Sequence, residues 1–160
     1  MASRRRFLAF LGAATPVAAA AVLGYRLLPG ESESSGLPAI RWNEERCANC
    51  GMVISDRLYA AAWIGAGGAE THFDDPGCML ALLVDDGIAP ETSYFVRSFD
   101  SDAWLDARTA SYVRSDALRS PMAYGIAAFS SEAIAREALS SPDTVVLDWP
   151  AIVAVVDGLA

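Results

Sequence analysis

After residue 36 the chain alternates between short apolar runs and polar turns, and this pattern predicts short strands and helices. In the first half, an apolar run with aromatic side chains ends at a glycine-rich turn, and a loosely alternating run follows as the second arm of a hairpin. An acidic cap with a proline inside it, Asp74-Asp75-Pro76, then predicts the start of a helix. The predicted elements are strands at 58–64 and 69–73, a helix that stops at Gly87, and a strand at 92–97.

The second half repeats this order of elements. In both halves the helix begins just after a strand that ends in phenylalanine, at Phe73 and at Phe129. The predicted elements here are strands at 111–114 and 123–129, a helix capped by Ser130-Ser131-Glu132 that reaches Leu139, a strand at 144–149 and a final apolar helix at 150–160. We therefore predict an α+β fold of two small strand-strand-helix-strand (ββαβ) units, over 39–100 and 101–160.

Residues 1–29 differ from this pattern and predict an export signal. Three arginines at positions 4–6 precede an uncharged run, residues 7–25, that is rich in alanine and leucine. Paired arginines before Phe-Leu resemble the twin-arginine signal of proteins that are exported already folded. The alternative is an uncleaved helix that anchors the chain in a membrane, because the run approaches the roughly 20 residues that span a bilayer. In both cases we expect the folded part to follow a flexible linker at 30–38 and to lie in the periplasm or on the extracytoplasmic face of the membrane.

The charge of the folded part excludes one class of function. All 20 acidic residues lie after position 30, whereas four of the 12 arginines lie before it, and the chain has no lysine. Such an acidic surface repels nucleic acid, so we expect no nucleic-acid partner. A composition with 53% hydrophobic residues is sufficient for a packed core.

The candidate chemistry centres on the sequence ERCANCGM, in which Cys47 and Cys50 are followed by Met52. The Cys-x-x-Cys spacing fits several functions. A zinc site would need Cys78 and His72 as further ligands, and a thioredoxin-type redox pair would need a buried strand before it, which this sequence lacks. A plain disulfide suits an oxidising compartment. Met52 favours a fourth interpretation, because a thioether beside a thiolate is a soft ligand set that suits Cu(I).

Four motifs follow one another along the chain, at residues 47–52, 73–80, 103–113 and 120–129. Together they resemble the NosL family of copper chaperones associated with nitrous oxide reductase. The resemblance implies two ββαβ units like those of organomercurial lyase, in an exported protein without enzyme activity. Such a protein takes Cu(I) from an upstream donor and delivers it to the reductase. It also implies Cys50 and Met52 as metal ligands, together with Met122. The chain departs from the family where the Pro-Met-Gly motif has alanine, Ala123, and in having no cysteine for lipid attachment.

The remaining candidate residues keep more than one interpretation. His72 can complete a Cu(I) site or form hydrogen bonds at the surface, and Cys47 is either a further ligand or the disulfide partner of Cys50. We expect Cys78 to be a small buried hydrophobic residue, and the two aspartates before it to cap the helix. The candidate metal ligands are therefore Cys50, Met52, Met122, Cys47 and His72. The rival functions are an organomercurial-lyase-like or other thiol enzyme, and a disulfide-stabilised module without a metal.

Overall fold

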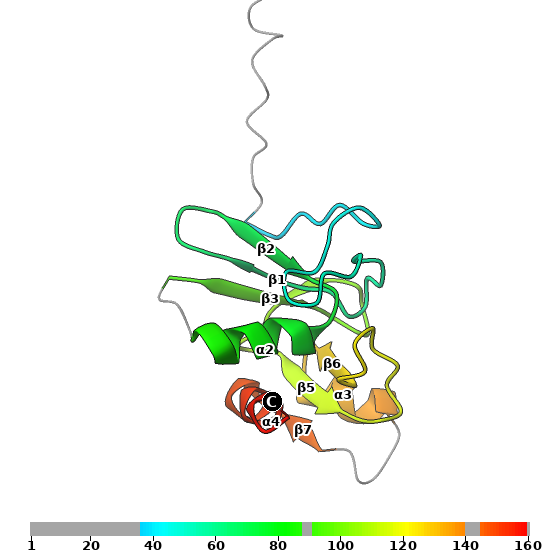
Figure 1. Cartoon of the computed structure of the whole chain (residues 1–160). Coiled ribbons are helices and arrows are strands. Elements are labelled where there is room, and N and C mark those ends of the chain that lie inside the picture. The colour runs from blue at the N-terminus through cyan, green and yellow to red at the C-terminus, as the bar shows by residue number, and fades with distance from the viewer. Residues whose placement is uncertain (1–35, 88–90, 140–144, 160) are drawn as a thin grey trace, which may run out of the picture. The chain divides into compact units, whose positions relative to one another are not determined.

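The computed structural model describes residues 36–87, 91–139 and 145–159 (Figure 1). The predicted export signal at 1–29 and the predicted linker up to residue 35 lie outside the described residues. Within the described part of the chain, no helix is both long enough and apolar enough to cross a membrane. The chain from Gly36 to Ala160 forms one compact unit.

The first sheet has four antiparallel strands in the order β2-β1-β3-β4. Its strands are β1 (Ala61–Ile64), β2 (Glu70–Phe73), β3 (Ser93–Arg97) and β4 (Trp104–Asp106). β1 and β2 form the predicted hairpin, in which Ala61 lies opposite Phe73. Helix α2 (Pro76–Asp86) follows β2 directly, because Asp75 caps the helix and the ring of Pro76 fits its first turn.

The second sheet has three strands in the order β6-β5-β7. Its strands are β5 (Ser111–Arg114), β6 (Ile126–Phe129) and β7 (Val146–Leu147). Helix α3 (Glu132–Leu139) follows β6, and α4 (Trp149–Asp157) follows β7. Figure 1 shows α2 lying between the first sheet and the elements of the second half, and α2 contacts β1, β2, β6 and α4. The beginning of α2 is therefore a meeting point of both halves.

One apolar core runs through both halves of this unit. Phe73 from β2 and Met79 from α2 are fully buried in it, together with Tyr112 from β5. The ring of Trp149 in α4 lies 5.6 Å from the ring of Tyr94 in β3 and 6.4 Å from that of Tyr112. Burial of several large side chains, at roughly 1.5–3 kcal/mol each, is the main force that holds the halves together.

The observed order of elements confirms the predicted α+β fold of two ββαβ units, and it adds a strand that the sequence pattern did not predict. β4 lies in the second half of the sequence but pairs with β3 of the first sheet, where Phe95 lies opposite Asp106. A bridge between Ser98 and Ala128 also joins the end of β3 to β6. The boundary between units at 100 and 101 stays a prediction, and these pairings cross it.

Three predicted strands are shorter than expected, for local reasons. The strand predicted at 58–64 begins only at Ala61, because residues 57–59 form a turn. The strand predicted at 123–129 begins only at Ile126, because Ala123 and Gly125 have φ values of 60° and 64°. This left-handed backbone cannot continue a strand. Of the strand predicted at 144–149, residue 144 lies outside the described residues. The strand β7 ends at Leu147, because Asp148 accepts a hydrogen bond of 3.0 Å from the backbone N–H of Ala151 and so caps α4.

Candidate metal centre

The cysteine motif forms a tight loop before β1. The backbone N–H of Cys47 donates to the carbonyl of Met52 over 2.8 Å, and the N–H of Gly51 donates to the carbonyl of Cys47 over 2.9 Å. Gly51 has a φ of 75°, a conformation that glycine adopts without steric cost. Arg46 then forms an antiparallel bridge with Val53 that closes the loop. The loop is thus fixed by its own backbone, and both of its cysteines have defined positions.

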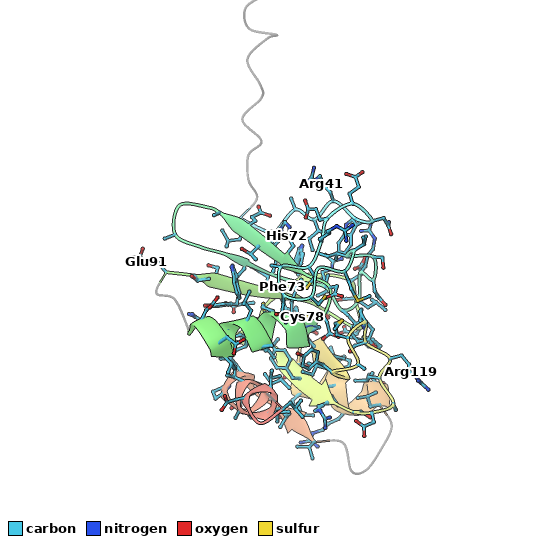
Figure 2. The ribbon with its side chains drawn as sticks, viewed as in Figure 1. Arg41, His72, Phe73, Cys78, Glu91 and Arg119 are labelled. Atoms are coloured by element: carbon cyan, nitrogen blue, oxygen red, sulfur yellow. The ribbon has the colours of Figure 1, made fainter. Side chains whose placement is uncertain are left out.

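A second segment, at the junction of β2 and α2, brings further donors to this loop. Figure 2 shows His72 and Phe73 at the end of β2 and Cys78 in the first turn of α2. Asp74 lies between them and is only 1% exposed. A hydrogen bond of 3.0 Å from the N–H of Ala48 to the carbonyl of His72 ties the loop to β2. Contacts between distant parts of the sequence therefore assemble the site.

Four donors converge at this junction. The Sγ atoms of Cys47, Cys50 and Cys78 and a carboxylate oxygen of Asp74 all lie within 4.8 Å of one another. We call these four residues the cysteine cluster. The three thiols are free, with no disulfide among them. Cys47 is 3% exposed and Cys78 is 0% exposed, whereas Cys50 is only half-buried. The cluster therefore has one sulfur that solvent can reach.

The three thiols of the cluster do not ionise alike. A hydrogen bond from Cys78 lowers the pKa of Cys47 to about 6. Burial raises the pKa of Cys50 to about 11, and the neighbouring charges of Cys47 and Asp74 add to this rise. The hydrogen bond that Cys78 donates to Cys47, together with burial, raises the pKa of Cys78. Since Cys78 lies in the first turn of α2, the positive end of the helix dipole also favours an anionic sulfur here. Of the three thiols, Cys47 therefore loses its proton most readily.

The two candidate methionines lie at the edge of this arrangement. Met52 belongs to the loop, and its side chain is 49% exposed. Met122 is half-buried, and its backbone N–H donates to Oδ2 of Asp75 over 3.1 Å. Asp75 is the neighbour of Asp74 in the sequence, so the structure brings residues 120–124, which we call the Pro-Met segment, to the same end of α2 as the cluster. The roles of both thioethers as ligands stay predictions.

The histidine lies outside the cluster of four donors. Its Nδ1 atom lies 2.5 Å from Oε2 of Glu45, and its Nε2 atom lies 2.9 Å from Oε2 of Glu70. Burial raises the pKa of Glu45, but the hydrogen bonds from Arg41 and His72 outweigh this effect and leave that pKa below its usual range. Both ring nitrogens of His72 therefore already have carboxylate partners, and a role as a metal ligand would require one of them to leave. That role also stays a prediction.

The sequence predicts that Cys78 is a small buried hydrophobic residue and that Asp74 is part of a helix cap. Cys78 is buried as expected, and Asp75 alone provides the cap through a hydrogen bond of 2.8 Å from the N–H of Gly77. The additional finding is that Asp74 and Cys78 belong to the cluster. One signal was available: a helix cap needs only one aspartate, and this helix has two with a cysteine in its first turn.

Three thiols and a carboxylate that converge in this way define a candidate site for a thiophilic metal ion. The family model of NosL matches residues 40–143, which is more than half of the chain. The chain therefore belongs to the NosL family. The match confirms the resemblance drawn from the four sequence motifs.

The fold agrees with this assignment. It is similar to the crystal structure of the copper chaperone NosL from Shewanella denitrificans, with a TM-score of 0.60 and 15% sequence identity. The similarity covers 71% of this chain and 93% of that chain. A comparison with curated proteins found no match.

Proposed function

We propose that this protein is a Cu(I) chaperone without enzyme activity, in which the copper ion is cargo. The observation that carries the proposal is the cysteine cluster, with three free thiols of which only Cys50 is half-exposed. Thiolates and thioethers are the ligands that select Cu(I). Membership of the NosL family and the likeness to a protein that is itself a copper chaperone support this proposal.

Cys50, Met52 and Met122 are the proposed primary ligands, with Cys47 within reach of the same ion. A chaperone must release its cargo by ligand exchange, so its ligands have to be accessible to a partner protein. Cys50 and Met52 meet this need because they are the exposed sulfur donors of the loop. Thioethers carry no charge, so Met52 or Met122 can leave the ion without leaving an unpaired anion buried in the protein.

The charge balance at the cluster also suits a monovalent ion. Cys50 holds its proton at neutral pH, since its pKa is raised to about 11. When Cu(I) replaces that proton, the net charge beside the buried carboxylate of Asp74 does not change. The cluster also contains Cys47, whose pKa is lowered to about 6, so it can balance the charge of a divalent ion as well. The preference for Cu(I) over a divalent ion therefore rests on the soft sulfur donors.

A competition titration tests the assignment. Reduced protein is titrated with Cu(I) in the absence of oxygen, against a chromophoric Cu(I) chelator. We expect Cys50→Ser to weaken binding by at least the roughly 10–100-fold that loss of a second-shell partner costs at a metal site. Met79→Leu is the control, because it removes a sulfur atom that is fully buried in the core and is not a proposed ligand. Tight Cu(I) binding that survives Cys50→Ser would contradict the assignment.

The proposed recipient is nitrous oxide reductase, and the proposed location is the extracytoplasmic side of the membrane, reached through the export signal at 1–29. The pattern of the export signal supports the location, and the recipient is the one that the resemblance to the NosL family implies. Copper-loaded protein is incubated with copper-free reductase, and copper in the re-isolated reductase is measured together with its activity. We expect transfer to be faster than from the copper-loaded chelator alone. No acceleration would contradict this recipient and leave Cu(I) binding as a separate result.

The rival thiol enzyme is favoured by one observation, the lowered pKa of Cys47 beside other thiols. Such an enzyme also needs a base that accepts protons during turnover. Both ring nitrogens of the single histidine have carboxylate partners, but the carboxylate of Asp74 lies 3.5 Å from Sγ of Cys50 and is a base within reach. A turnover assay therefore has to separate the two functions. We expect no turnover of an organomercurial or a disulfide substrate. Catalytic turnover that Cys47→Ser abolishes would favour the enzyme instead.

A further inference from the structure

Asp75 joins the two halves of the protein through a single buried carboxylate. Its Oδ1 atom accepts a hydrogen bond of 2.8 Å from the N–H of Gly77, within the first half. Its Oδ2 atom accepts one of 3.1 Å from the N–H of Met122, which lies 47 positions further along the chain. The side chain is 0% exposed, so neither bond competes with water. Two oxygens on one side chain thus hold the helix start and the Pro-Met segment together.

Asp75 is more deeply buried, and accepts more hydrogen bonds, than a helix cap requires. Asp148 performs the same capping for α4, with one hydrogen bond of 3.0 Å from the N–H of Ala151 and a proline in the first turn, and it is exposed. A capping aspartate at the surface avoids the cost of burying a carboxylate. Asp75 bears that cost, and it differs from Asp148 in two further hydrogen bonds, from the backbone of Met122 and from the side chain of Ser120. Both donors belong to the segment 120–124.

A second contact holds the same segment on α2. A Cβ atom placed on Gly77 would lie 2.1 Å from Cγ and 2.6 Å from Cβ of Tyr124. Only glycine permits this approach, so the segment 120–124 rests directly on the first turn of α2. Ser120 also accepts a hydrogen bond of 3.0 Å at its Oγ atom from the N–H of Gly125, which fixes the shape of this segment.

From these contacts we propose that Asp75 is a positioning residue that places Met122 of the second half beside the cysteine cluster of the first half. The inference rests on the proposed function in one respect, that Met122 supplies a thioether ligand. Asp75 does not touch the ion. It acts through the backbone of Met122, and the metal centre is then complete only when both halves are docked.

The test is a double-mutant cycle in the full chain. Asp75→Asn keeps the size of the side chain but leaves only one acceptor oxygen for two N–H donors. Cu(I) affinity is measured by chelator competition for wild type, Asp75→Asn, Met122→Leu and the double variant. We expect each single variant to bind about tenfold more weakly, within the range for loss of a supporting group at a metal site. The double variant should be no weaker than Met122→Leu alone.

Asp148→Asn is the matched control, because it weakens a helix cap of the same chemistry without touching the Pro-Met segment. We expect it to lower the unfolding temperature and leave Cu(I) affinity unchanged. If Asp75→Asn weakens binding equally in both the Met122 and Met122→Leu backgrounds, its effect is a general loss of stability and the proposal is overturned. If Asp75→Asn does not fold, Gly77→Ala displaces the same segment through Tyr124, and the same cycle applies.

A metal-free measurement separates this proposal from the proposed function. Protein labelled with carbon-13 at the methionine methyl groups reports the surroundings of Met122, which Met122→Leu assigns. We expect Asp75→Asn, but not Asp148→Asn, to shift the methyl signal of Met122. An unmoved signal overturns the positioning role even if Cu(I) binds. A shifted signal in a protein that does not bind Cu(I) overturns the proposed function and supports the placement of Met122 by Asp75.

Discussion

The Sγ atom of Cys50 lies 3.5 Å from Oδ1 and 3.6 Å from Oδ2 of Asp74, so a thiol of the loop faces a buried carboxylate at the end of β2. A negative charge at this distance opposes ionisation of the thiol. The carboxylate therefore helps to keep Cys50 protonated until a metal ion replaces the proton.

Replacing this carboxylate should make Cys50 more reactive. Asp74→Asn removes the charge and keeps the size, so the pKa of Cys50 should fall and its alkylation by iodoacetamide at mildly alkaline pH should become faster. The rate at Cys50 is measured by mass spectrometry of the modified peptide. Asp116→Asn is the control, because the Asp116 side chain is 96% exposed. An unchanged rate in Asp74→Asn would show that burial alone raises the pKa of Cys50.

The reduced, metal-free protein should form one thiolate in mildly acidic solution. The pKa of Cys47 is lowered to about 6, whereas that of Cys50 is raised to about 11. A depressed pKa stabilises the folded state above the pKa of the unfolded thiol, and this contribution is lost as pH falls through about 6. Thiolate absorbance in the ultraviolet should therefore rise around pH 6 in wild type but not in Cys47→Ser.

Cys78→Ala offers a second check on the same titration. It removes the thiol that donates to Cys47, so the ionisation of Cys47 should move to higher pH. A step that stays near pH 6 in Cys78→Ala would contradict the hydrogen bond as its cause.

His72→Gln should separate a structural role from a ligand role. Since both ring nitrogens contact carboxylates, we expect the variant to lose stability, because the half-buried Glu45 loses a partner. Cu(I) affinity should change by less than about twofold, or roughly 0.4 kcal/mol. The measurements are thermal unfolding without metal and chelator competition with Cu(I). A loss of affinity as large as that caused by Cys50→Ser would identify His72 as a ligand.

Ala123→Gly should stabilise the protein. Ala123 has a φ of 60°, which costs a residue with a Cβ roughly 1–2 kcal/mol, and the family's Pro-Met-Gly motif has glycine at this position. Glycine also gains freedom in the unfolded chain, so we expect a net gain of about 0.5–1 kcal/mol in the free energy of unfolding. Urea unfolding measures it. The exposed Ala117, whose φ is not positive, is the control, and Ala117→Gly should destabilise slightly.

Much of the fold could be predicted from local signals. The hairpin before α2, the cap at Asp75 and the repeated order of elements all follow from turn residues and apolar runs. β4 could not be predicted in this way, because its pairing with β3 depends on a contact between halves. The late start of β6, at Ile126, depends on positive φ values at Ala123 and Gly125, and alanine gives no sign of such a conformation.

The candidate site also contains some residues that the sequence predicts and others that it does not. Cys50 and Met52 stand out in the sequence because they share one short loop whose backbone is fixed by Gly51. Cys78 and Asp74 have no distinctive signal in the sequence, because a cysteine on an apolar helix and an aspartate at the start of a helix have common structural roles. Only the docking of the loop on β2, through the bond from Ala48 to His72, brings these donors together.

The continuity of the core between the halves has a consequence for the lifetime of the protein. Because β4 completes the first sheet and the core spans both halves, unfolding of one half removes support from the other. An ion that binds only the folded chain then protects all of it, by about 2.7 kcal/mol when its free concentration is 100 times its Kd. On the proposed function, delivery of the cargo therefore returns the chaperone to its less stable form. The emptied chain is then the form that proteases degrade first, so a molecule that is not reloaded has the shorter half-life.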